Sequence, residues 1–312
     1  MAVRPRTQDF LWMAAGAVVL ALVLLVVWRF RQETNPAQAL AFQARRVDLV
    51  GKMQLALARS AEAEKSAVLA VTDRDSQGFA DQARAATAEV EEERQELAKL
   101  LDAGGTQRER DLLGQFEQAL KDLERVDDEV LRLAVRNTNL KAYALLFGPA
   151  ADALGGFEAA LSRLTDKFAA GPSGKQVVKL AFEARNALLH VQVLLSPHVA
   201  EESDPRMDAL EALMQKDENQ ARSDVEGLAA LAGLKADPDL ASARTAFDRY
   251  RELKVQILAL SRENTNVRSL AISLNQKRKA TILCQDALAA EKQAILDEPI
   301  AGVTYGRPPS PR

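Results

Sequence analysis

The sequence predicts an all-α protein in which an N-terminal transmembrane helix precedes two tandem up-down four-helix bundles. Long tracts are rich in Ala, Leu, Glu, Lys, Arg and Gln, the strongest helix formers, while Pro and Gly cluster in a few short segments. No sustained alternation of β-branched or aromatic residues with polar ones predicts a strand. One uncharged apolar run lies near the N-terminus, and the rest of the chain repeats an apolar pattern at a spacing of 127 residues.

The apolar run from Leu11 to Trp28 predicts the transmembrane helix. It holds 18 residues without a charge, close to the ~20 that span a bilayer core. Trp12 and Trp28 lie where interfacial aromatic residues are expected, and Arg29 and Arg31 follow. The run is longer than the core of a cleaved signal peptide, and no cleavage pattern of small residues follows it directly. We therefore expect a short tail at 1–10 and an uncleaved signal-anchor at 11–30.

The orientation of this anchor rests on weak asymmetry. Two arginines precede the run and two follow it, so the positive-inside rule does not choose a side. The free N-terminal amine favours a cytoplasmic tail. The expectation is therefore a single-pass protein of the cytoplasmic (inner) membrane with the bulk of the chain facing the periplasm. A body facing the cytoplasm is the alternative.

The repeat is clearest around two similar octapeptides. LAVRNTNL spans 133–140 and LSRENTNV spans 260–267, and apolar residues on both sides match in register, such as Val130 with Ile257. Conserved spacing of apolar residues marks a duplicated structural unit. The pattern predicts one four-helix module at 36–168 and a second at 175–297, joined by a Gly-Pro-Ser-Gly linker. A tail at 298–312, rich in Pro and Gly, is expected to be disordered.

Local signals place the helices inside each module. In the first we expect helices at about 36–73, 77–102, 106–136 and 138–164, and in the second at about 175–196, 204–234, 239–263 and 266–296. Gly104 and Gly105 end the second helix, and Thr106 with Glu109 has the spacing of a capping box that opens the third. Along that third helix an apolar stripe predicts a buried seam. Its members are Phe116, Leu120, Leu123, Val126, Val130 and Leu133.

One polar triplet lies between the third and fourth predicted helices of each module. The triplets are Asn137, Thr138 and Asn139 in the first module and Asn264, Thr265 and Asn266 in the second. Asn and Thr favour caps and turns over helix interiors. We expect each triplet to form a tight helix–helix turn with the same backbone, and Thr138 or Asn139 to cap the following helix. The alternatives are a ligand or partner surface made by both triplets, or one unbroken helix through each.

Composition argues against several classes of function. The net charge is −3 and no basic stripe with aromatic residues is present, so nucleic acid is not an expected partner. The single Cys284 excludes an internal disulfide and is expected to be a buried hydrophobe. The only histidines, His190 and His198, would lie about 12 Å apart on one helix, too far for one metal. We expect His190 at an interface, His198 in a loop beside Pro197, no metal, no cofactor and no enzymatic activity.

Two charged clusters are expected to be solvated helix faces. The acidic run between Glu89 and Glu96 lies near basic residues at helical spacing. Lys277, Arg278 and Lys279 form a basic group on the last helix, for which binding of an anionic ligand is the alternative. No residue can be assigned as ligand-binding from the sequence.

The organisation resembles the four-helix-bundle sensor domain of methyl-accepting chemotaxis receptors. The resemblance rests on the anchor, the long first helix and the polar turn before an Ala/Leu-rich helix, and is closest at 112–164 and 240–296. It implies a bundle outside the cytoplasmic membrane that binds small ligands or partner proteins. The chain departs from the family because the bundle occurs twice and neither a second apolar span, a HAMP domain nor a methylation region follows. The family's ligand-binding arginines match no position here.

The expected function is therefore that of a membrane-anchored, extracytoplasmic, sensor-like protein in signal transduction. It would bind a small ligand or a partner protein and act through a separate signalling protein, and a homodimer is one arrangement compatible with this. The alternative is a structural or scaffolding membrane protein that assembles through its long helices.

Overall fold

The computed structural model describes residues 21, 23 and 36–300, and the regular secondary structure of 36–300 is entirely helical. The all-α prediction is therefore confirmed for this part of the chain. The expected anchor at 11–30, with Trp12, Trp28, Arg29 and Arg31, lies almost wholly outside the described residues, as does most of the expected tail at 298–312.

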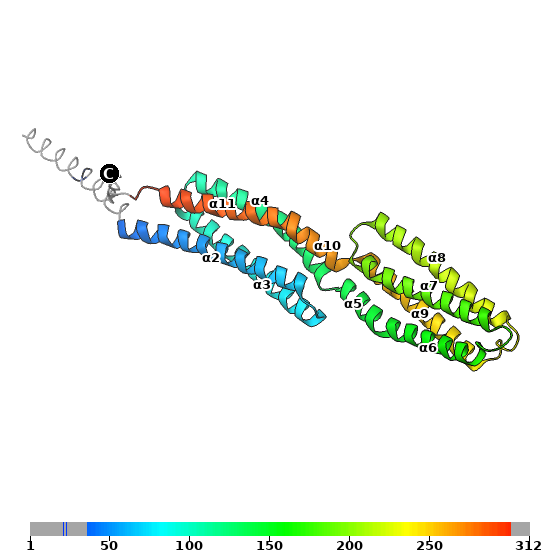
Figure 1. The fold of residues 1–312 in the computed structure, drawn as a ribbon. Helices are drawn as coiled ribbons and strands as arrows, with labels where there is room; N and C mark the ends of the chain where they lie inside the picture. Colours follow the sequence, from blue (N-terminus) through cyan, green and yellow to red (C-terminus); the bar gives the residue numbers. More distant parts are fainter. Residues whose placement is uncertain (1–20, 22, 24–35, 301–312) are drawn as a thin grey trace, which may run out of the picture. The chain divides into compact units, whose positions relative to one another are not determined.

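The helices follow two similar series (Figure 1). The first series is α2 (Pro36–Leu69), α3 (Asp73–Gly104), α4 (Gln107–Ala134), α5 (Thr138–Leu145), the π-helical turn η1 (Leu146–Ala150) and α6 (Ala151–Phe168). The second is α7 (Gly174–Ala200), α8 (Asp204–Ala230), α9 (Pro238–Glu263), α10 (Thr265–Ile272), the π-helical turn η2 (Ser273–Lys277) and α11 (Arg278–Asp297).

The repeat is preserved in backbone detail. Asn137 and Asn264, 127 residues apart, both adopt the left-handed conformation, with φ/ψ of 50°/38° and 51°/39°. The two π-helical turns also lie 127 residues apart. In η1, Pro149 lacks an N–H and its ring crowds the preceding turn, which favours local widening of the helix. Because η2 contains no proline, the widened turn belongs to the repeat and not to that residue.

Two compact units divide the chain. Unit 1 comprises 1–58, 86–120 and 282–312, and unit 2 comprises 59–85 and 121–281. Helices α2, α3, α4 and α11 therefore contribute residues to both units. These units do not coincide with the modules 36–168 and 175–297 that the sequence predicts.

Helix α4 confirms two local predictions. At the start of α4 the Glu109 N–H donates to Thr106 Oγ1 (3.2 Å), and the Thr106 N–H donates to Glu109 Oε2 (3.0 Å). These reciprocal bonds form the expected capping box. The expected seam of α4 is also buried along its length, from Phe116 in unit 1 to Val130 and Leu133 in unit 2.

Unit 2 contains two apolar clusters. The larger one, here the main core, packs α5, η1 and α6 against α7, α8 and α9, with Phe157 and Phe247 in ring contact at 5.8 Å. The smaller one packs the ends of α2 and α4 against the start of α3, and Ile272 of α10 lies against it. Residues 142–164, which the sequence places with α2–α4, therefore pack with the helices of the other repeat.

The predicted helix reversal at each triplet is wrong. Before Asn137, residues of α4 belong to the smaller cluster, and after it Ala142 and Leu146 belong to the main core. Figure 1 shows α5 leaving the end of α4 without folding back along it. The apolar stripe of the helix after each triplet can pack against equivalent helices of either repeat. Local sequence therefore does not specify against which repeat that helix packs.

One helical stretch of the described residues, 107–168, is long and apolar enough by composition to cross a membrane. Its most apolar window has a mean hydropathy of 1.2 and is 33% buried. Leu154, Phe157 and Leu161 from this stretch are members of the main core.

Candidate functional site

The two polar triplets bind each other within unit 2. The Thr138 N–H donates to Thr265 Oγ1 (3.2 Å), and the Thr265 N–H donates to Thr138 Oγ1 (3.1 Å). The two hydroxyl oxygens are 3.1 Å apart, and both threonines are buried. Each residue thus meets its own counterpart, 127 positions along the chain. This is the contact pattern of a local two-fold axis between the repeats.

The asparagines extend the same reciprocity. The backbone N–H of Asn139 donates to Asn266 Oδ1, and that of Asn266 donates to Asn139 Oδ1, both at 3.1 Å. The first backbone N–H groups of a helix need partners from outside that helix. Here each of the two helices, α5 and α10, receives them from the first turn of the other. Neither helix has a cap from the side chain at its own N-cap position.

Asn137 and Asn264 occupy the two breaks, in place of the predicted caps Thr138 and Asn139. Asn tolerates the left-handed conformation better than most residues, and both side chains are 1% exposed. Asn137 Nδ2 donates to Asp73 Oδ1 and to Ser76 Oγ, both at 3.0 Å. The hydrogen bond to the Asp73 carboxylate lowers the pKa of Asp73. Asn264 Nδ2 donates to the backbone oxygen of Glu201 (2.7 Å). The amides therefore tie each break to a neighbouring helix end.

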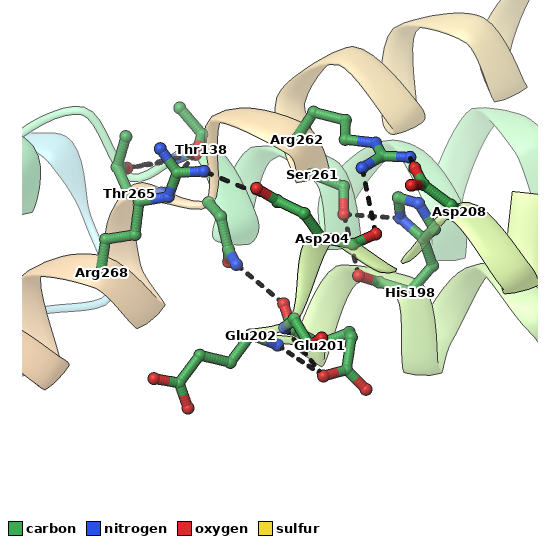
Figure 2. A network of polar contacts seen from close by, with 12 residues as sticks. Thr138, His198, Glu201, Glu202, Asp204, Asp208, Ser261, Arg262, Thr265 and Arg268 are labelled. Carbon is green, nitrogen blue, oxygen red and sulfur yellow. Dashed lines mark hydrogen bonds and ion pairs between the residues drawn. The ribbon is translucent and has the colours of Figure 1, made fainter. Parts of the chain in front are cut away.

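A second polar group adjoins the triplets and includes His198 (Figure 2). The expected loop position of His198 is wrong, because α7 continues through Pro197 to Ala200 and the imidazole is fully buried. Its Nδ1 lies 2.8 Å from Ser261 Oγ and its Nε2 lies 2.9 Å from Glu211 Oε1. Burial lowers the pKa of His198, so the ring is neutral near pH 7.

Arg262 connects this histidine group to α8. Its Nε donates to Glu211 Oε1 (2.7 Å), which holds the pKa of Glu211 below its ordinary value. Its other nitrogens reach Asp208 and the Asp204 backbone oxygen. The group thus joins the end of α7, the start of α8 and the end of α9 (Figure 2).

Ser261, His198 and Glu211 form a line of hydroxyl, imidazole and carboxylate, which sequence reasoning missed because the three residues lie on three different helices. A nucleophilic relay needs a hydroxyl that a substrate can reach. Ser261 is fully buried, and its hydroxyl donates to the His198 backbone oxygen 3.0 Å away besides contacting His198 Nδ1. The arrangement therefore supports a role in positioning helices.

A cavity of about 390 Å³ lies between α8 and α9. Its floor is apolar, formed by the nearly buried Val225 and Phe247. Three arginines and two carboxylates complete the lining: Arg222, Arg244, Arg251, Glu226 and Asp248.

Two of these arginines are held in place by one buried carboxylate. Glu218 Oε1 accepts hydrogen bonds from Arg222 (3.1 Å) and Arg251 (2.7 Å). The Arg251 guanidinium also lies 5.8 Å from the centre of the Phe247 ring. Arg244 is exposed, and no ion pair joins it to another described residue. The spacing of 244, 247, 248 and 251 predicts one helix face, but sequence alone could not bring Arg222 of α8 to it.

The remaining sequence candidates have ordinary surroundings, with one exception. Cys284 is buried, as expected, but His190 is exposed and pairs with Asp217 at 2.6 Å, so its expected position at an interface is wrong. The exception is Lys277, expected on a solvated face, which is only 3% exposed and binds buried carboxylates. Among the described residues no group of three or more His, Cys, Asp or Glu side chains could hold a metal ion.

No protein-family model matches this chain, and no curated protein matches it.

Proposed function

We propose that this chain is a membrane-anchored, sensor-like helical protein that binds a small anionic ligand in the cavity between α8 and α9. The observation that carries this proposal is the set of three arginines above an apolar floor of Val225 and Phe247. Binding sites of small molecules commonly combine an apolar lining with a few convergent polar groups, in cavities of ~300–1,000 Å³. The volume of about 390 Å³ falls within that range.

The charges of the cavity favour an anion of modest size. Guanidinium groups bind carboxylate and phosphate oxygens through two parallel hydrogen bonds. Glu218 holds Arg222 and Arg251 before any ligand arrives, which reduces the entropy lost on binding. Glu226 and Asp248 reduce the charge of the lining to a net +1, which favours a small ligand over an extended polyanion.

The cellular setting of this proposal comes from the sequence. The anchor at 11–30 supports attachment to the cytoplasmic membrane, and the resemblance to chemoreceptor sensor domains supports a periplasmic body. In this setting ligand binding would be passed to a separate signalling protein.

Calorimetric titration of residues 33–312 tests the cavity, with phosphate, sulfate, succinate and citrate as probes. We expect at least one probe to bind the parent and Arg244→Ala to weaken that binding at least tenfold. Arg249→Ala is the matched control, because Arg249 is an exposed arginine of the same helix that does not line the cavity. Silence of all four probes, or equal binding by Arg244→Ala, would end the anion proposal.

A second candidate function, assembly with other helices, is favoured by exposed apolar side chains on α7. Val178, Phe182 and Val193 are 42%, 54% and 65% exposed and share one helix face by spacing. Exposed apolar residues grouped on one face commonly mark interaction surfaces. Concentration-dependent sedimentation together with silent titrations would favour this scaffold role.

A further inference from the structure

Helices α4 and α9 keep the same apolar pattern but carry opposite charges. Between 117 and 136, every position that is charged in both repeats changes sign at the shift of 127. The pairs are Glu117/Arg244, Lys121/Asp248, Asp122/Arg249, Glu124/Arg251, Arg125/Glu252, Asp127/Lys254 and Arg136/Glu263. Packing alone would preserve the apolar residues of a repeat but would not invert its charges. The inversion therefore needs an electrostatic explanation.

The pair Asp127/Lys254 is buried, with exposures of 4% and 6%. Asp127 binds Lys277 of η2, whose ammonium also lies 3.5 Å from Glu64 Oε2. Lys254 binds Glu218, which is 4% exposed. Asp127 and Lys254 therefore each have a buried partner of opposite charge.

The two π-helical turns differ at the decisive position. Lys277 of η2 corresponds to Ala150 of η1, which is fully buried. Within unit 2, η2 brings a cation to two buried carboxylates, Glu64 and Asp127. In the main core, η1 packs against α9, the helix that carries Lys254, and at the corresponding position it offers only the methyl group of Ala150.

The alternative arrangement, in which each repeat keeps its own last helix, would mismatch these charges. Ala150 would replace Lys277 beside Asp127 and Glu64, leaving two buried carboxylates without a cation. Lys277 would take the buried place of Ala150 against α9, where the repeat pairs it with Lys254 as it now pairs it with Asp127, so two ammonium groups would be buried together. Unpaired buried charges are strongly unfavourable, and like charges at close range add repulsion.

We propose that these buried charges select the exchanged arrangement of the last helices. The segment α10–η2 packs on the ends of α2–α4, and α5–η1 packs on α7–α9, because only this pairing places Lys277 beside Glu64 and Asp127 and keeps it away from the helix that carries Lys254. Specificity between similar alternatives commonly depends on charges that penalise the wrong partner. Apolar packing, which the repeats share, does not distinguish the two arrangements.

Distance measurements between spin labels test this in the full-length chain. In a Cys284→Ala background, labels replace two exposed residues, Lys65 of α2 and Leu274 of η2. The parent should give one short distance. Moving the lysine with Lys277→Ala and Ala150→Lys should abolish that short population, through rearrangement or loss of the fold.

The deciding variant combines Glu64→Gln, Asp127→Asn and Lys277→Met. It removes all three charges of the buried group together, so none of them is left unpaired. We expect it to remain helical and to show a second, longer distance population. Arg125→Glu is the matched control at an exposed inverted position and should keep the single short distance. A single short distance in the neutralised variant would overturn the proposal, because packing alone would then select the arrangement.

Discussion

Glu291 is the most unusual single residue of unit 1. It is fully buried, and neither carboxylate oxygen has a hydrogen-bond partner among the described residues. Burial, and then the negative charge of Glu109, raise the pKa of Glu291 to about 8, while Arg46 opposes this. Glu291 is therefore mostly protonated near neutral pH. A neutral carboxyl is far less costly to bury than a carboxylate.

This pKa predicts how stability depends on pH. A carboxyl with a raised folded-state pKa contributes stability that is fully present below its unfolded value of 4.5 and is lost as the pH rises towards about 8. Glu291→Gln removes this loss, so its stability relative to the parent should rise between pH 5 and pH 8, by on the order of a few kcal/mol. Urea unfolding at both pH values measures it. Glu129→Gln, at an exposed site of α4, is the control, and equal pH dependence in all three proteins would contradict the assignment.

The threonines at the junction of the repeats predict a coupling energy. Thr138→Ala and Thr265→Ala each remove the hydroxyl that accepts the other's N–H, and each should cost about 1 kcal/mol. Because the hydroxyls also contact each other, the double variant should differ from the sum of the single ones. Denaturant unfolding of the four proteins measures this cycle. Strict additivity would show that the two contacts act independently.

At the scale of elements, sequence predicted what depends on neighbours in the chain. The capping box at Thr106 and the seam of α4 follow from local spacing, and both are present. The identical helix breaks at Asn137 and Asn264 follow from the repeat. The direction that the chain takes after each break cannot be predicted from the repeat, because both repeats offer equivalent apolar surfaces. His198 was misplaced because Pro197 removes one hydrogen bond of α7 without ending the helix.

The candidate site shows the same limit. The face of α9 that carries Arg244, Phe247 and Arg251 can be read from helical spacing. The cavity, however, also needs Arg222 from α8 and the buried Glu218 that holds it. The position of these α8 residues beside α9 depends on contacts between helices, which a single sequence does not predict.

The seam gives a prediction at this scale. Val130→Asp and Ile257→Asp each place a carboxylate at a position with no exposure, so each should destabilise the fold by about 3 kcal/mol or more. Thermal unfolding followed by circular dichroism measures the loss. Val255→Asp is the matched control, because Val255 lies two residues before Ile257 and is 62% exposed. A parent-like melting curve for either buried variant would mean that the seam is not part of the cooperative core.

At the scale of the whole molecule, the repeat supplies both similarity and difference. Equivalent backbones meet at the triplets, where each helix start is satisfied by the other. The inverted charges then make the two repeats unequal: the arginine-lined cavity lies in the second, and its Arg244 and Arg251 correspond to Glu117 and Glu124 of the first. A duplicated unit can in this way share one architecture while its two copies carry different charged surfaces.

The proposed setting of the molecule predicts its topology. With the anchor at 11–30 and a cytoplasmic tail, a phosphatase reporter fused after Arg312 should be active, and a cytoplasmic fluorescent reporter at the same point should be dark. Deleting residues 1–33 is the control and should reverse both signals, because the apolar run is then gone. The opposite pattern in the full chain would place the α8–α9 cavity in the cytoplasm. The ligand would then be a cytoplasmic anion, and the resemblance to periplasmic sensor domains would be architectural only.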